Sequence, residues 1–361
     1  MRREVHVSPE KSRLVGRAGS SRRLRAALER RFTGEVPFFE TYVAEEIVDE
    51  VMGRPMGTHM LKLPPGDYVE FLARTGMDAA YLYEGWFLGR KNVVDARGRV
   101  QYVDGTIKSR GDFGQIVAPS LETVRRRIES FLAAAGGTEL GVVCALDVSV
   151  SIMTTAIGPT DSLILLHEDP AFVDEFLDRV EEYTLPLAQC VVQYPVDAIL
   201  MTGPQCGKTG PIISPAMHEE FIFPRTRKVM DIIRPSGIPV ILHSDGDNSA
   251  FMDWIIGAGF AAIHPVEPVG GFDIYRLKSA YGDRICLCGN IDVGDVLTRG
   301  TPEQVRADVL EHIRRLAPGG GYVCGSSHDI TGSVPFENFC ALARTVCSTN
   351  VSADGSLSAS A

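Results

Sequence analysis

The stretch "IPVILHSDGD" at residues 238–247 is an apolar run that ends in His243, Asp245 and Asp247. An unbroken apolar run of this kind is typical of a strand buried on both faces, as in a parallel sheet. Three explanations of its polar end are open: a solvated loop, a polar cover on a core, or a site that holds a metal or a substrate. The choice depends on what the other strands of the same sheet carry at their ends.

The chain repeats this pattern of an apolar run with a polar end followed by a segment of helical period. A clear helix is predicted within residues 301–320, where Thr301 and Gln304 form a capping box and Pro302 suits the first turn. Eight such β–α alternations predict an α/β fold, a single (βα)8 TIM barrel. A doubly wound open sheet is the alternative, but no run is followed by the glycine-rich phosphate turn of that fold. The eight runs are 36–43, 79–86, 141–148, 197–204, 238–245, 260–268, 284–292 and 321–329.

The barrel is predicted to span residues 36–348, preceded by an N-terminal arm and helix at 1–35 and followed by a disordered tail at 349–361. Alternating residues and turn signals at 89–114, after the second run, predict a lid-like insertion or a β-hairpin. The arginines of the first 31 residues are interpreted as a solvated arm and an exposed helix face.

Composition restricts the class of protein. The formal net charge of −10 argues against binding to nucleic acid, which requires a basic surface. No stretch reaches the ~18 to 20 apolar residues of a membrane span, and no secretory signal is visible at the N-terminus. Eight cysteines scattered along 361 residues fit reduced thiols better than a disulfide framework. We therefore expect a cytoplasmic protein that binds neither nucleic acid nor membranes.

Polar residues follow the strands where a barrel places its active site, at the C-terminal strand ends. His243 and Asp245 are two residues apart on a strand, so their side chains point to one side. Glu267 ends the next strand, ~4.8 Å away in a parallel sheet, and His328 ends the eighth. Two imidazoles with carboxylates suit zinc or another first-row divalent ion. The predicted metal ligands are thus His243, Asp245, Glu267 and His328, although His243 alone can be a hydrogen-bonded strand end.

Other strand-end residues are candidates for catalysis and for substrate binding. Glu84 and Asp147 are carboxylic acids able to donate a proton, although Glu84 can equally pair with a nearby arginine. Asn290 and Asp292 can orient a substrate, support the metal ligands, or simply begin a helix. The predicted catalytic residues are Glu84 and Asp147, and the predicted substrate-binding residues are Glu40, Tyr83, Trp86, Asn290 and Asp292.

Five stretches together make the chain resemble the uroporphyrinogen decarboxylase superfamily, which includes methylcobamide:coenzyme M methyltransferases and other corrinoid-dependent methyltransferases. The family fold is a (βα)8 barrel. The stretches are "GPIISPAMHEEFIFPRTRKVMDII", "VILHSDGD", "GFAAIHPVEP", "LCGNIDVGDVLTRGTPEQV" and "GGGYVCGSSHDITGSVPFEN".

The resemblance is closer in character to the methyltransferase branch. The run at 36–43 lacks the arginine motif of the decarboxylases, and Glu84 with Gly85 stands where Ser-Asp is expected. In the methyltransferases zinc is held by a His-x-Cys pair, a glutamate and a later cysteine. His243 and Glu267 match that pattern, whereas Asp245 and His328 stand where the two thiolates would be.

The leading hypothesis is a metal-dependent methyltransferase that moves a methyl group between a small molecule and a corrinoid carrier or another acceptor. The metal would polarise the atom that gains or loses the methyl group. The corrinoid would come from a partner protein, because the chain has no Asp-x-His-x-x-Gly motif. The resemblance also implies a homodimer. The alternatives are a metal-dependent decarboxylase or lyase acting on a small carboxylic acid, and a non-catalytic binding module.

Overall fold

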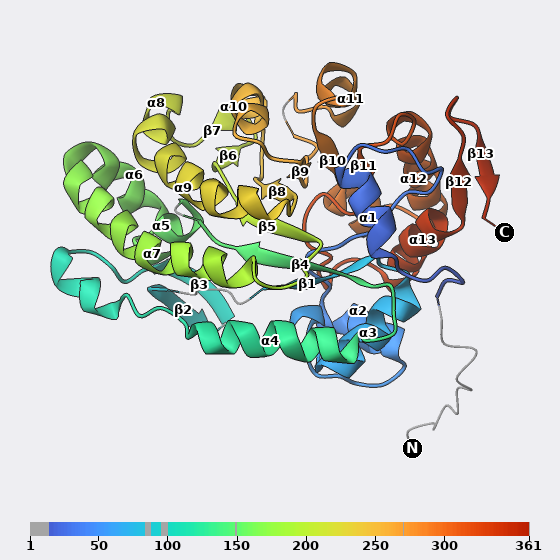
Figure 1. Ribbon diagram of the computed structural model, residues 1–361, viewed down its shortest axis with the longest axis horizontal. Helices are drawn as coiled ribbons and strands as arrows, with labels where there is room; N and C mark the ends of the chain where they lie inside the picture. The colour runs from blue at the N-terminus through green and yellow to red at the C-terminus, as the bar shows by residue number, and fades with distance from the viewer. Residues whose placement is uncertain (1–13, 84–87, 95–99, 149, 270, 361) are drawn as a thin grey trace. The chain divides into compact units, whose positions relative to one another are not determined.

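The computed structural model describes residues 14–83, 88–94, 100–148, 150–269 and 271–360. The chain divides into two compact units. The first unit comprises Met1–Leu82, Arg127–Val143 and Ala261–Ala361, and the second comprises Tyr83–Arg126 and Cys144–Phe260. Figure 1 shows the helices and strands with the labels used below.

The first unit begins with helices and a strand, and resumes with three strands that alternate with helices and two short strands near its end. Its early elements are α1 (Ser21–Leu28), α2 (Glu45–Met52), η2 (Met60–Lys62), α3 (Pro65–Thr75) and β1 (Ala79–Leu82). Its later elements are β9 (Ala262–His264), α11 (Ile274–Tyr281), β10 (Cys286–Cys288), the π-helix η7 (Val293–Thr298), α12 (Pro302–Leu316), β11 (Tyr322–Val323), α13 (Phe336–Cys347), β12 (Thr349–Val351) and β13 (Leu357–Ala359).

The described residues of the second unit include two antiparallel strand pairs, β2–β3 and β6–β7, several helices and two further strands of the main sheet. Its elements are β2 (Arg90–Val94), β3 (Val100–Gly105), η3 (Arg110–Gln115), α5 (Val150–Ala156), α6 (Pro159–Glu168), α7 (Pro170–Val191), β5 (Ala198–Thr202), β6 (Cys206–Gly207), β7 (Gly210–Pro211), α8 (Pro215–Met217), the π-helix η4 (His218–Ile222), α9 (Phe223–Ile233), η5 (Arg234–Ser236), β8 (Val240–His243), η6 (Ser249–Phe251) and α10 (Met252–Gly257). Helix α4 (Leu121–Ala134) and strand β4 (Gly141–Leu146) contribute residues to both units.

The strands confirm the predicted α/β class. Sheet order is β1-β4-β5-β8-β9-β10-β11, which is the order of these strands in the chain. In the second unit β5 and β8 pair in parallel, and in the first unit β9, β10 and β11 do so. Each of the seven strands lies within a predicted apolar run, and their residues are almost entirely buried.

The eighth predicted strand, at residues 36–43, is present only as isolated pairings. Phe38 bridges Cys324 and Val43 bridges Ile330, both in the parallel sense. On its other side the segment exchanges backbone contacts with Asp78, whose N–H donates to the Phe38 carbonyl at 2.9 Å. Within the first unit, residues 36–43 therefore lie between the strand β11 and the residue that precedes β1, as the remaining strand of a (βα)8 barrel must.

The helices follow the capping signals of the sequence. Helix α12 begins after Thr301, whose side chain accepts from the Gln304 N–H while the Gln304 side chain accepts from the Thr301 N–H. Its buried stripe includes Val305, Val309 and Ile313, and Figure 1 shows it beside α13. None of the helices in the described ranges combines the length and apolar character that a membrane crossing requires.

Two segments outside the main sheet had been predicted, with different outcomes. The expected hairpin is present as β2 and β3, whose role as a lid stays a prediction. The tail at 349–361 was expected to be disordered, and this expectation is wrong because β12 and β13 form an antiparallel hairpin there. The hairpin is held to the first unit because the Val351 N–H donates to the Gly34 carbonyl at 2.9 Å.

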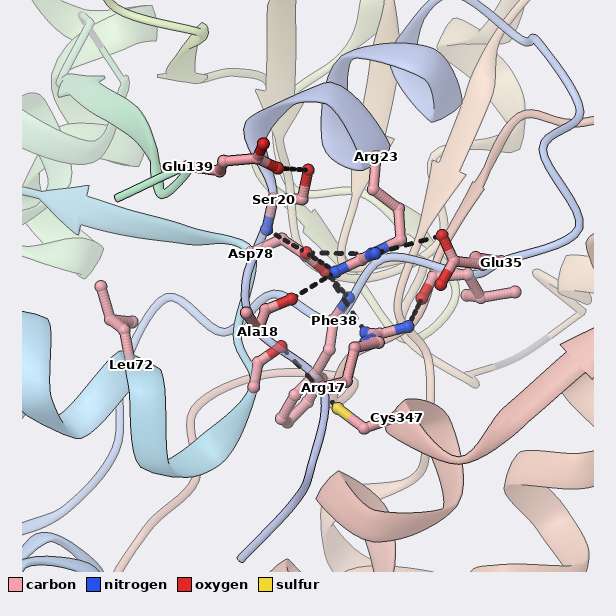
Figure 2. A network of polar contacts seen from close by, with 12 residues as sticks. Arg17, Ala18, Ser20, Arg23, Glu35, Phe38, Leu72, Asp78, Glu139 and Cys347 are labelled. Carbon is pink, nitrogen blue, oxygen red and sulfur yellow. Dashed lines mark hydrogen bonds and ion pairs between the residues drawn. The ribbon is translucent and has the colours of Figure 1, made fainter. Parts of the chain in front are cut away.

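The N-terminal arginines are also not uniformly solvated, because two of them surround a buried carboxylate (Figure 2). Asp78 is 0% exposed and immediately precedes β1. Its Oδ1 accepts from Arg23 Nη2 at 2.8 Å and from the Ser20 N–H at 2.7 Å. Its Oδ2 accepts from the Phe38 N–H at 2.7 Å and lies 3.4 Å from Arg17 Nη2. Asp78 thus connects the N-terminal arm, the 36–43 segment and β1.

Replacing Asp78 tests this connection. Asp78→Asn leaves Arg17 and Arg23 without their buried anion, so we expect the free energy of unfolding to fall by about 3–5 kcal/mol. The control is Asp231→Asn, which removes an exposed pair with Arg234 and should cost no more than about 1 kcal/mol. Urea denaturation of both variants provides the measurement. Equal small losses in both would contradict the structural role given to Asp78.

Candidate functional site

The end of β8 carries two of the predicted metal ligands in the second unit. His243 Nε2 lies 3.8 Å from Asp245 Oδ1, and the two side chains are 23% and 45% exposed. Strand β8 is positioned by β5, since Thr202 pairs with His243 and the Gly203 N–H donates to the His243 carbonyl at 2.9 Å. The sequence expectation that these two side chains lie on one side of the strand end is therefore met within this unit.

A buried asparagine holds the turn that carries Asp245. Asn248 is fully buried, and its amide nitrogen donates to the carbonyls of Ser244, Asp245 and Gly246, each at 3.1 Å. Gly246 has φ +73, and a Cβ there would lie 2.4 Å from the Cys206 carbonyl oxygen. Sequence reasoning missed Asn248. The available signal was an asparagine directly after the Asp-Gly-Asp turn, because asparagine side chains commonly bond to nearby backbone.

Asp147 and Tyr83 form a second polar pair in the same unit. Tyr83 Oη donates to Asp147 Oδ2 at 2.6 Å. Burial raises the pKa of the Asp147 carboxyl above its ordinary value, while this bond and the neighbouring His243 oppose the rise. Burial and the Asp147 charge raise the pKa of Tyr83 as well, so the phenol is the proton donor of the pair. The other predicted residues of this strand end, Glu84 and Trp86, lie outside the described residues.

In the first unit, the segment "GNID" at 289–292 connects three strand ends. Gly289 has φ +114, and a Cβ there would lie 2.1 Å from the Pro265 carbonyl oxygen, so only glycine permits this approach to the end of β9. Ile291 bridges Ser326 beyond β11, and its N–H donates to the Gly325 carbonyl at 3.1 Å. These contacts position the segments that carry Glu267 and His328.

Asn290 and Asp292, predicted to bind substrate, both have backbone partners. Asn290 Nδ2 donates to the Val266 carbonyl at 2.7 Å. Asp292 Oδ1 accepts from the N–H groups of Gly294 and Asp295, at 2.7 and 2.8 Å, and so caps the π-helix η7. Their contact with a substrate and their support of metal ligands stay predictions, whereas the capping of η7 by Asp292 matches the third interpretation, the beginning of a helix.

Glu267 and His328 lie at the ends of β9 and β11. Glu267 is half-buried, and its carbonyl accepts from the Val269 N–H at 2.8 Å. The His328 side chain is 46% exposed, and its Nδ1 accepts from the Asp329 N–H at 2.8 Å. A ring nitrogen that accepts this bond cannot bind a metal at the same time, so ligation by Nδ1 would require the Asp329 contact to be released.

Glu40, predicted to contact substrate, is instead 1% exposed and bonded to Ser326. Its Oε1 accepts from the Ser326 N–H at 2.9 Å, and its Oε2 lies 2.5 Å from Ser326 Oγ. Ser326 Oγ also contacts the His328 carbonyl, which only accepts. The Ser326 hydroxyl and N–H both donate to the Glu40 carboxyl group. Glu40 is therefore a buried acid held by two donors of one residue.

Comparison with known proteins places the chain in a family. A family model described as uroporphyrinogen decarboxylase (URO-D) matches residues 102–348. The chain belongs to the uroporphyrinogen decarboxylase family.

Individual relatives include both a methyltransferase and decarboxylases. A methylated-thiol–coenzyme M methyltransferase of Methanosarcina mazei is 26% identical over 179 residues, which is 49% of this chain and 44% of the relative. A uroporphyrinogen decarboxylase of Pseudoalteromonas translucida is 28% identical over 160 residues, covering 42% and 43% of the two chains. The chain thus spans a little under half the length of these curated relatives.

A solved structure supports the fold. A methyltransferase from Methanosarcina mazei superposes with a TM-score of 0.70 over 90% of this chain and 97% of that one, at 18% sequence identity. At this identity the likeness establishes the fold, and the activity has to be argued from the site.

The buried acid Glu40 yields a prediction about pH. Burial raises the pKa of Glu40 to about 8, the two bonds from Ser326 oppose the rise, and the Asp329 charge adds to it. Between the ordinary value of 4.5 and 8, the unfolded chain releases this proton while the folded chain keeps it. The free energy of unfolding should therefore fall as the pH rises through this window, by up to roughly 5 kcal/mol from this group.

Glu40→Gln removes this dependence because an amide can donate to Ser326 Oγ and accept from the Ser326 N–H without titrating. We expect the variant to be more stable than the parent at pH 8 and to lose that advantage toward pH 5. Urea denaturation across this range, with the exposed Glu122→Gln as a control, measures the effect. Parallel pH profiles of Glu40→Gln and the parent would show that Glu40 is ionised in the folded chain.

Proposed function

We propose that this protein is a metal-dependent methyltransferase that moves a methyl group between a small molecule and a corrinoid carrier or other acceptor. The observation that carries the proposal is the pair of His243 and Asp245 at the end of β8. Family membership and the relative named as a methylated-thiol–coenzyme M methyltransferase favour methyl transfer. The corrinoid, supplied by a partner protein, follows from the family resemblance.

The proposed ligands are His243, Asp245, Glu267 and His328. Two ligand atoms that each bind zinc at about 2.1 Å in a tetrahedral site are separated by roughly 3.4 Å. The measured 3.8 Å between His243 Nε2 and Asp245 Oδ1 needs only a small adjustment. His243, Asp245 and His328 each offer one atom of the types that bind metals. The pair therefore fits a metal, and a nitrogen and oxygen set suits zinc or a harder divalent ion.

In the proposed reaction a bound metal would supply a Lewis acid for the atom that carries or receives the methyl group. Asp147 would hold the proton. Burial raises the pKa of this carboxyl and so favours its protonated form, the Tyr83 bond to Oδ2 opposes this rise, and Oδ1 would be the oxygen that carries the hydrogen. A departing oxygen of the substrate would take that proton, with Tyr83 then stabilising the carboxylate. Glu84 is the second proposed acid.

A decarboxylase or lyase acting on a small carboxylic acid is the second candidate. It is favoured by the decarboxylases among the relatives, such as that of Pseudoalteromonas translucida. The same ligands would hold a substrate carboxylate. The two functions differ in their products, since only the lyase releases carbon dioxide.

Metal content tests the ligand set. We expect the purified protein to bind zinc or another divalent ion, and His243→Ala and His328→Ala to lose most of it because each removes a ligand. His167→Ala, an exposed position on α6, should keep the parental content. Elemental analysis after dialysis gives the answer. If both ligand variants retain the parental content, the proposed set is wrong.

The role of Asp147 can be tested separately from metal binding. With methylcobalamin as the methyl donor and a panel of small thiols and phenols, the reaction runs in the opposite direction, and Asp147 would accept the proton that the thiol or phenol loses. Asp147→Asn should therefore lower turnover by about 10²–10⁴-fold, as expected for a lost acid–base group. Its metal content should not change. Carbon dioxide released from small carboxylic acids, with no methyl transfer to the panel, would instead select the lyase.

A further inference from the structure

The residue before Glu267 has an unusual backbone conformation. Val266 is fully buried and has φ +50, in the left-handed region that β-branched residues rarely occupy. Such a conformation is strained and persists only where the surroundings impose it. It occurs one residue before a proposed metal ligand, so the contacts that impose it also determine where Glu267 lies.

Two hydrogen bonds hold the peptide groups on either side of the Glu267 Cα. The Val266 carbonyl accepts from Asn290 Nδ2 at 2.7 Å, and the Glu267 carbonyl accepts from the Val269 N–H at 2.8 Å. Fixing both adjacent peptide planes fixes the direction of the Cα–Cβ bond between them. The orientation of the Glu267 side chain is therefore set partly by Asn290.

His312, a buried residue of α12, holds Asn290 in turn. His312 Nε2 lies 3.0 Å from Asn290 Oδ1, and because Oδ1 only accepts, the ring must donate. The opposite nitrogen, Nδ1, lies 2.8 Å from the Asp308 carbonyl and 3.3 Å from Tyr275 Oη. With a polar partner at each nitrogen, the ring is held in one orientation. This leaves the amide of Asn290 only one orientation, with Nδ2 toward Val266.

We propose that Asn290 and His312 are positioning residues that hold Glu267 in the backbone conformation from which its carboxylate serves the metal. This inference rests on the proposed function. In this proposal His312 acts by holding the amide of Asn290. Asn290 acts by holding the Val266 carbonyl, and contact with a substrate is not needed for this role.

The test measures zinc affinity by chelator competition in the full chain. Outer-sphere partners of metal ligands typically contribute 10–100-fold to affinity, so Asn290→Ala and His312→Ala should each weaken zinc binding by about that factor. His312→Gln, whose amide can still donate to Asn290, should recover much of the loss. Tyr275→Phe is the matched control, because it removes a contact from the opposite side of the same ring.

The pocket beside the ring allows chemical rescue. His312 and Asn290 line a pocket of about 450 Å³ together with Tyr275 and Phe272. Imidazole added to His312→Ala can enter there and should restore part of the zinc affinity, whereas it should not help Asn290→Ala. The proposal would be overturned if zinc affinity were unchanged in both alanine variants, or if Tyr275→Phe lost as much affinity as they do. It would also be overturned if imidazole had the same effect on His312→Ala and Asn290→Ala.

A readout without metal separates this inference from the proposed function. In the metal-free protein, Asn290→Ala should increase hydrogen exchange at the Val269 amide, which donates to the Glu267 carbonyl, while Tyr275→Phe should not. If Glu267→Gln leaves zinc affinity unchanged, the ligand set fails whatever Asn290 does. If Glu267→Gln weakens binding while Asn290→Ala alters neither affinity nor exchange, only the positioning role fails.

Discussion

The structure of the first unit depends on one buried carboxylate. Asp78 has no exposed surface and accepts from backbone and arginine donors that belong to segments far apart in sequence. A buried anion without such donors would be strongly destabilising, so the arm, the 36–43 segment and β1 have to assemble together. That segment also carries Glu40, which bonds to Ser326 just before His328. The contacts around Asp78 are therefore connected to the residues near a proposed ligand.

The strand ends of this unit are held by side chains that bond to backbone. Asn290 bonds to the Val266 carbonyl, Glu40 to the Ser326 N–H, and Asp292 to the start of η7. In the second unit Asn248 does the same for the turn that carries Asp245. Some polar residues at the strand ends can thus contact a ligand, and others hold those ligand-contacting residues in place. Preorganised sites require both kinds.

The sequence predicted what depends on local pattern. Seven apolar runs became strands, and the capping box at Thr301 and Gln304 formed as expected. The burial of Arg23 was missed because its partner, Asp78, is 55 residues away and no periodicity indicates such a pair. The C-terminal hairpin was missed because its strands are three residues each and one pairs with Gly34. The Asp354-Gly355 turn, with φ +84 at the glycine, was the signal available.

The same limit applies to the candidate site, where pattern identified residue types but not hydrogen bonds. His243 and Asp245 are close, as their spacing predicted, whereas the bonds from Ser326 to the buried Glu40 join residues far apart in the chain, which no local pattern indicates. His328 illustrates the consequence. Its Nδ1 accepts from the Asp329 N–H, so a neutral ring carries its hydrogen on Nε2, and metal binding at that nitrogen requires the proton to move to Nδ1 and this bond to be lost. Within the proposed set, His328 therefore has an additional energetic cost of ligation that a cysteine at this position would not have.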